Sequence, residues 1–211
     1  MKITTSLQLV TFAAGLALSS AFAQTAPAAL TAEDGAGLLG ATYSGVEFGY
    51  THHVESAPRA LRRYGFVSHK PMAELGNTVD GTFRYDYIRG SLPGGTLHQN
   101  HLSASLLRYW VDGSAKPFVH ADLGWAWHKA GGASDSSFLY RLGAGAEVRV
   151  RPRVAITPFV MFTDTPSLDD RVWNFGAKFG YRMDRHWHGG LTVKVDSEHN
   201  IEYALGFQRR F

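Results

Sequence analysis

Acidic and basic residues alternate with apolar residues over much of this sequence. Such charges could line a narrow path for ions or solutes, or they could neutralise one another inside a closed interior. The set comprises Glu47, Asp80, Arg84, Asp86, Asp122, Arg141, Glu147, Arg149, Lys178, Arg182, Lys194, Asp196 and Glu202. Because the two signs are mixed throughout, mutual neutralisation is the favoured interpretation, and a narrow path is the functional alternative.

Histidine is the second residue type that could do chemistry, since the chain has 10 histidines. Three close pairs stand out: His52 with His53, His98 with His101, and His186 with His188. Residues two apart on a strand share a face, but no Glu or third His completes a ligand set at zinc spacing. We therefore expect no metal, no cofactor and a packing role for these imidazoles.

The composition limits the classes of protein that can hold these residues. The 211 residues include no cysteine, which excludes a disulfide scaffold, a thiolate zinc site and a cysteine nucleophile. Apolar residues make up 45% of the chain and aromatic residues 13%, yet the mean hydropathy is only -0.15. This balance is typical of one folded domain in which apolar and polar residues alternate.

The N-terminus has the pattern of a cleaved export signal. Residues 1–23 combine Lys2, a short apolar run and the sequence Ala21-Phe22-Ala23, whose small residues suit cleavage after Ala23. The apolar run is too short for a spanning helix, which needs about 20 residues. We read residues 24–40 as a flexible periplasmic lead-in and residues 41–211 as the folded domain. Without Lys2 the formal net charge falls from +3 to +2, and a charge this small does not indicate nucleic-acid binding.

From residue 42 onward, segments of about ten alternating residues are separated by turn residues, and this period predicts β-strands. Pro158 and the polar first half of 98–110 weaken two of the segments, and 61–70 fits either parity. Ten strands are expected, near 42–52, 61–70, 78–89, 98–110, 117–128, 137–150, 154–164, 171–182, 187–196 and 200–211.

The two faces of these strands favour a closed barrel over a soluble sandwich. One face is apolar, and the other combines glycine with charges of both signs, as a narrow lumen requires. Aromatic residues gather toward both strand ends, as at membrane interfaces, and lipid cannot satisfy an open sheet edge. The sequence therefore predicts an all-β fold, a closed antiparallel transmembrane β-barrel.

Three segments carry a resemblance to a known family. They are the last strand, 201–211, which ends in Phe211; the Pro-aromatic strand 116–127; and the glycine-rich strand 142–147. On these residues the chain resembles the small outer-membrane β-barrel proteins of Gram-negative bacteria, the porin-like family that includes OmpA-like barrels. The resemblance implies an outer-membrane location, lipid as a partner, and recognition of the strand ending at Phe211 by the barrel-assembly machinery.

The resemblance leaves the strand number open. Many relatives have eight strands, whereas the extra hairpin near 171–196 favours ten here. Short connections at 151–153 and 183–186 are expected to face the periplasm, and longer ones at 51–60, 89–97 and 129–136 to face outward. A monomer is expected.

Two classes of outer-membrane enzyme share features with this chain. Lipid A deacylases use a His and a Ser two apart on a strand, as in His101-Leu102-Ser103, but no partner acid is evident. Omptin proteases use carboxylates at the outer rim of the barrel. Asp169-Asp170 is expected in a loop at that rim, but omptin loops are far longer. We expect a non-catalytic barrel with a side-chain-filled lumen and a structural or surface-interaction role; a narrow channel and an enzyme of these two kinds are the alternatives.

The export signal makes a direct prediction about the mature protein. If Ala21-Phe22-Ala23 is the cleavage site, N-terminal sequencing of the membrane-embedded protein will read from Gln24. A sequence that begins at Met1 would show that the apolar run is retained as an anchor.

Overall fold

A computed structural model describes residues 37–53, 60–92, 95–168 and 170–211, and the expected signal at 1–23 lies outside them. The alternating sequence forms ten strands. They are β1 (Tyr43–His52), β2 (Ala60–Pro71), β3 (Val79–Leu92), β4 (Gly95–Tyr109), β5 (Ala115–Ala130), β6 (Ala133–Arg151), β7 (Val154–Thr165), β8 (Asp170–Arg182), β9 (Trp187–Asp196) and β10 (Ile201–Arg210). No helix in the described ranges is long and apolar enough to cross a membrane.

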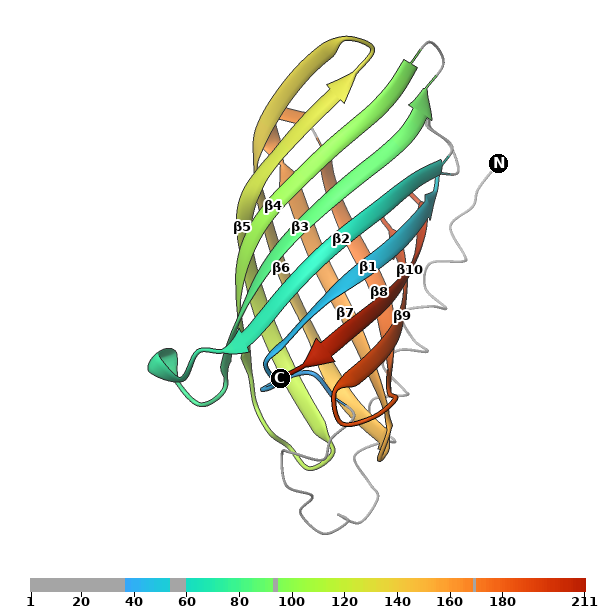
Figure 1. Ribbon diagram of the computed structural model, residues 1–211. Coiled ribbons are helices and arrows are strands. Elements are labelled where there is room, and N and C mark those ends of the chain that lie inside the picture. Colours follow the sequence, from blue (N-terminus) through green and yellow to red (C-terminus); the bar gives the residue numbers. More distant parts are fainter. Residues whose placement is uncertain (1–36, 54–59, 93–94, 169) are drawn as a thin grey trace, which may run out of the picture. The chain divides into compact units, whose positions relative to one another are not determined.

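The ten strands close into one antiparallel barrel. Each strand pairs with its neighbours in sequence, and β1 pairs with β10 to complete the ring (Figure 1). The closing register runs without interruption from Tyr43 opposite Arg210 to His52 opposite Ile201. Every predicted strand is thus confirmed, and the number of strands is ten, as favoured, rather than eight.

The barrel has an apolar exterior and a polar interior, because successive side chains on a strand point to opposite faces. On β10, Tyr203, Leu205 and Phe207 are exposed, whereas Glu202 and Gln208 are buried. The parity of β2, which the sequence left open, is also fixed: Tyr64 and Phe66 point outward.

Pro158 lies within β7 and interrupts the ladder without ending the strand. The register between β6 and β7 runs to Gly145 opposite Phe159 and resumes at Val148 opposite Ile156. The two pairs between them are missing, as expected where proline lacks an N–H. The partner strand β8 pairs continuously past this point, which keeps β7 in the barrel.

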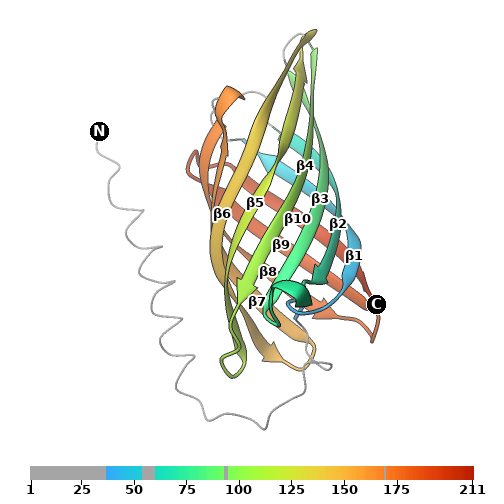
Figure 2. The same ribbon diagram turned by 90° about the vertical axis from the view of Figure 1, so that its left-hand side faces the viewer.

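The connections define two rims. The termini rim holds the start of β1, the end of β10 and the connections 72–78, 110–114, 152–153 and 183–186; the loop rim holds the other connections. Both short turns predicted for the termini rim are confirmed. The β3–β4 and β5–β6 hairpins reach furthest at the loop rim (Figure 2).

Two of the longer loops predicted from the sequence are wrong. Most of 89–97 and of 129–136 is strand, because β3 to β6 continue past the point where apolar alternation stops. The β5–β6 turn is reduced to Gly131 and Gly132, whose φ angles of 55° and 92° suit a two-residue hairpin that other residues strain to form. Residues 54–59 of the third predicted loop lie outside the described residues.

Candidate functional site

The middle of the lumen is filled by six charged side chains, which we call the central ion cluster. Its members come from five adjacent strands, β9, β10, β1, β2 and β3, and comprise three cations and three carboxylates. They are Glu47, Arg63, Arg84, Asp86, Lys194 and Glu202. The formal charges therefore cancel within the cluster.

Arg63 is the hub of the central ion cluster. Its Nη1 lies 2.9 Å from Oδ1 of Asp86 and 3.3 Å from Oε2 of Glu47, and its Nη2 lies 2.7 Å from Oε1 of Glu202. Its Nε also donates a 3.0 Å hydrogen bond to Glu202 Oε1. One guanidinium thus joins carboxylates from β1, β3 and β10.

The other two cations complete the cluster. Arg84 binds Glu47 and donates from Nε to Oδ2 of Asp86 at 2.8 Å, and Lys194 Nζ lies 3.0 Å from Oε2 of Glu202. Each carboxylate therefore has at least two cationic partners. This pairing is what allows charges to be withdrawn from bulk water at an acceptable free energy.

A second charged pair occupies the opposite wall of the lumen. Arg141 on β6 donates from Nη1 to Oδ2 of Asp122 on β5 at 2.9 Å, and the Ser103 hydroxyl donates to the same oxygen at 3.3 Å. The ring of His120 fills the space in front of Gly143, where a larger residue would not fit. Small residues thus make room for polar side chains across the lumen.

The segment before β1 is bound to three strands at the termini rim. The backbone N–H of Leu38 donates to Glu147 Oε2, and that of Gly40 donates to Asp80 Oδ2, both at 2.7 Å. Lys116 Nζ donates to the carbonyl oxygen of Leu39 at 2.6 Å. Residues 38–40 are therefore bound to β3, β5 and β6; residues 24–36 of the predicted lead-in lie outside the described part of the chain.

A small cavity of about 130 Å³ lies behind this segment. His188 and Gln208 line it, and each is 1% exposed with no hydrogen-bond partner for its side-chain nitrogen and oxygen atoms. Lys178 and Glu147 also contribute to the wall. The volume and the polar side chains in the wall suit a few water molecules, whose hydrogen bonds would satisfy His188 and Gln208.

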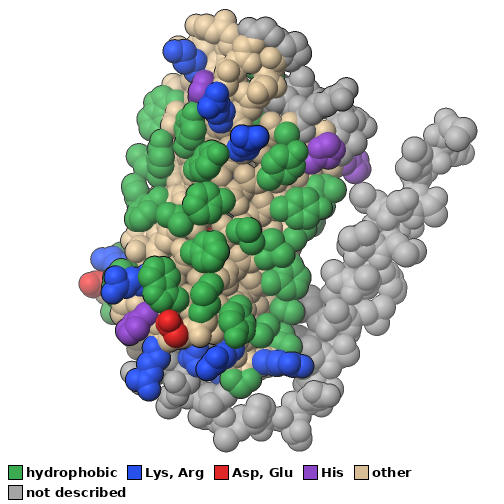
Figure 3. Space-filling view, turned by 45° about the vertical axis from the view of Figure 1, so that its right-hand side comes forward, with side chains coloured by type: hydrophobic (Ala, Val, Ile, Leu, Met, Phe, Trp, Pro, Cys, Tyr) green, Lys and Arg blue, Asp and Glu red, His purple; other side chains and the backbone are tan. Residues whose placement is uncertain are grey.

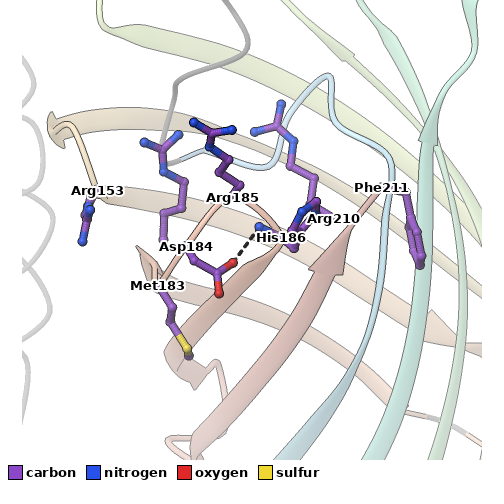
Figure 4. A pocket seen from close by; sticks show the side chains of 8 residues that line it. Arg153, Met183, Asp184, Arg185, His186, Arg210 and Phe211 are labelled. Carbon is purple, nitrogen blue, oxygen red and sulfur yellow. Dashed lines mark hydrogen bonds between the residues drawn. The ribbon is translucent and has the colours of Figure 1, made fainter.

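A larger basic pocket of about 740 Å³ opens at the termini rim (Figure 4). Its lining residues are Arg153, Arg182, Met183, Asp184, Arg185, His186, Arg210 and Phe211. Asp184 accepts hydrogen bonds from the backbone N–H of His186 at 2.7 Å and of Trp187 at 2.8 Å, and these bonds hold the pKa of its carboxyl below the usual range. With one acid against four guanidinium groups, the pocket favours anions.

The lumen assignment of the charged set is confirmed. All its members occupy inward positions, although Asp80 and Glu147 bind backbone N–H groups of residues 38–40 rather than cations of the set. Sequence reasoning missed Arg63, because β2 fitted either parity. The adjacent Arg62 and Arg63 offered one cation to each face, so the charge pattern could not choose between them.

Two of the three histidine pairs do not assemble. His98 points outward and His101 inward, and His188 is buried while His186 lies in a turn. Within the ranges that the structure describes, no group of three or more His, Cys, Asp or Glu side chains could hold a metal ion.

The structure places the residues of the two enzyme hypotheses in different settings. The acid beside Ser103 is Asp122, which accepts hydrogen bonds from the Ser103 hydroxyl and from Arg141. The acid directly opposite His101 is Asp86, which Arg63 and Arg84 already bind. A catalytic serine would instead donate to the histidine base. Asp169 lies outside the described residues, and Asp170 begins β8 at the loop rim.

Loss of the hub cation should cost stability. We expect Arg63→Met to lower the free energy of unfolding by about 3 kcal/mol, because three buried carboxylates lose a shared cation. The matched control is Arg108→Met, whose guanidinium lies 5.7 Å from the Trp110 ring at the barrel exterior; its cost should stay below about 1 kcal/mol. Urea unfolding in detergent measures both, and equal losses would remove Arg63 from its central role.

Comparison with known proteins supports the fold. No family model and no curated protein sequence matches the chain. The β domain of the Bordetella autotransporter BrkA matches with a TM-score of 0.50 at 10% identity, covering 82% of this chain and 99% of that one. The NanC porin (TM-score 0.47, 7% identity, 80% and 100% covered) and Neisserial surface protein A (0.46, 12%, 81% and 97%) are also similar. The chain therefore has the fold of the outer-membrane β-barrel proteins, in a ten-stranded form.

Proposed function

We propose that this protein is a non-catalytic outer-membrane barrel, closed to solutes by its own side chains, with a structural or surface-interaction role. The observation that carries the proposal is the combination of a charge-paired lumen with an apolar exterior. A soluble barrel would have a polar exterior instead, and an open pore would leave the lumen charges facing water.

The exterior has the properties of a lipid-facing surface. Leu106, Leu123 and Phe175 are each at least half exposed at 50%, 59% and 56%. On β4 the outward band lies between His98 and Arg108, and that length of tilted strand spans roughly 25 Å, the height of an outer-membrane apolar band. Asn100 is a polar outward residue. Its amide oxygen accepts a 2.7 Å hydrogen bond from the Tyr85 hydroxyl.

The lumen supports closure rather than conduction. The central ion cluster crosses five strands, the Arg141–Asp122 pair occupies the opposite wall, and residues 38–40 bind across the termini rim. A permeating ion would have to displace paired charges, each of which is costly to leave alone.

Export and assembly complete the proposal. The signal at 1–23 would deliver the chain to the periplasm, so the termini rim faces the periplasm and the loop rim faces outward. Phe211 is 71% exposed beside the closing strand, and its backbone N–H donates to the Thr42 oxygen at 3.0 Å. An exposed terminal aromatic is available to the assembly machinery, and the closed ring leaves no strand edge for a second copy, which favours a monomer.

Adjacent residues on β4 test the membrane assignment. Ala104 points outward in the middle of the band, whereas Ser105 points into the lumen opposite Asp122. In phosphatidylcholine vesicles, Ala104→Arg should lower the free energy of unfolding by about 2–4 kcal/mol, because a guanidinium is placed in hydrocarbon. Ser105→Arg, at the same depth, should cost less, because Oδ1 of Asp122 has no hydrogen-bond partner and can accept from the new guanidinium. A larger loss for Ser105→Arg would contradict the assignment of faces.

Planar bilayers test closure. The wild-type protein should insert without conductance steps, and Arg63→Ala combined with Arg84→Ala should give a cation-selective leak, because the carboxylates of Glu47, Asp86 and Glu202 remain. Heat-modified electrophoretic mobility verifies that the variant is folded, and Arg108→Ala serves as the control. Steady conductance from the wild-type protein would contradict closure and would identify the protein as a narrow channel.

A further inference from the structure

Four residues with basic side chains form one continuous row across the barrel exterior, which we call the basic row. Arg62 on β2 lies opposite Arg89 on β3, Arg89 lies opposite His98 on β4, and His98 lies opposite Lys129 on β5. No intervening residue separates them, although they come from four different strands. Sheet register alone brings them together.

The basic row lies on the lipid-facing side, at the loop rim. Arg62, Arg89 and Lys129 are exposed, and His98 has the same outward parity. Figure 3 shows basic side chains in a diagonal line above the hydrophobic band of this face. The row sits where lipid headgroups meet hydrocarbon.

A second registered row lies directly beneath it. Tyr64, Tyr87, Asn100 and Trp127 are opposite one another on the same four strands, each two residues closer to the middle of the band. The Tyr64 and Tyr87 rings are stacked at 6.3 Å, and the Tyr87 hydroxyl shares a 2.7 Å hydrogen bond with Nδ1 of His98. Aromatic side chains with polar tips mark the level of the membrane interface.

Among the outward strand positions that the structure describes, no acidic side chain lies opposite a member of this row. The one acidic residue among the described outward strand positions is Asp164 on β7. Its carboxylate already accepts hydrogen bonds from Arg171 at 3.0 Å and from the Tyr140 hydroxyl at 2.6 Å. Like charges directly opposite on neighbouring strands destabilise a sheet, and Arg62 and Arg89 are such a pair. An anion from outside the protein would reverse the sign of that interaction.

The other rim shows a different arrangement. Its outward cations are Lys70, Arg108 and Arg209, and the cross-strand partners of these residues carry no positive charge. Arg108 lies over the Trp110 ring and Arg209 over the Phe211 ring, at 5.7 and 5.4 Å. At outward strand positions, cations directly opposite one another therefore occur at the loop rim, whereas the termini rim gathers four of its arginines in the basic pocket.

We propose that the basic row binds the phosphate of lipid headgroups in the leaflet at the loop rim, with phosphomonoester lipids as the ligand class. The proposal rests on the membrane location argued above. Two guanidinium groups and an ammonium offer donors to a dianionic phosphate, and the aromatic row beneath would pack against the backbone and first methylenes of the same lipid.

The test compares two variants of equal charge. Arg62→Gln with Arg89→Gln removes two cations from the basic row, and Lys70→Gln with Arg108→Gln removes two from the opposite rim. Each protein is refolded into phosphatidylcholine vesicles with a minor fraction of phosphatidic acid, released in mild detergent, and examined by native mass spectrometry for retained phosphatidic acid. Protease protection measures insertion separately.

Wild type and the Lys70/Arg108 variant should retain phosphatidic acid, and affinity should fall about fivefold for each cation removed from the basic row. Equal retention by all three proteins would overturn the site, as would displacement of the lipid by millimolar inorganic phosphate, which would show a site for free anions. If the wild-type protein inserts but retains no phosphatidic acid, the inference fails and the membrane location stands. Failure to insert would instead contradict the proposed function.

Discussion

Charges buried inside this barrel need partners inside the barrel, either opposite charges or backbone hydrogen-bonding groups, and the rest of the lumen follows from that constraint. Ten strands leave an interior only wide enough for side chains. Arg63 satisfies the constraint by joining three carboxylates from three strands, and Arg84 and Lys194 supply the remaining cations. Glycine and small residues on the same inward positions provide the volume that these long side chains occupy.

The exterior obeys a different rule, because lipid offers no counter-charge in its hydrocarbon region and many at its headgroups. The outward face is accordingly apolar in the middle, aromatic above it, and basic at both rims. The same register that stacks ion pairs inside also aligns Arg62 with Arg89 outside. One sheet therefore supports ion pairs in its interior and a row of basic side chains on its outward strand positions.

Sequence reasoning predicted the fold and most of the lumen, since period-two alternation encodes both the strands and their faces. It could not place Arg63, because an Arg-Arg pair in a strand of uncertain parity provides a cation whichever face is inward. It also ended β3 and β5 too early, because strand extensions beyond the apolar band no longer alternate. The basic row depends on the registers of three strand pairs, which no local pattern specifies.

The seam between β1 and β10 joins the first strand of the barrel to the last one synthesised. Glu202 on β10 reaches across β1 to Arg63 on β2, so the central ion cluster spans that seam. Until β10 arrives, Arg63 lacks one of its partners and Glu202 has only Lys194. Closure of the ring and neutralisation of its interior are therefore a single event, which makes a partly assembled barrel electrostatically incomplete and favours all-or-none folding.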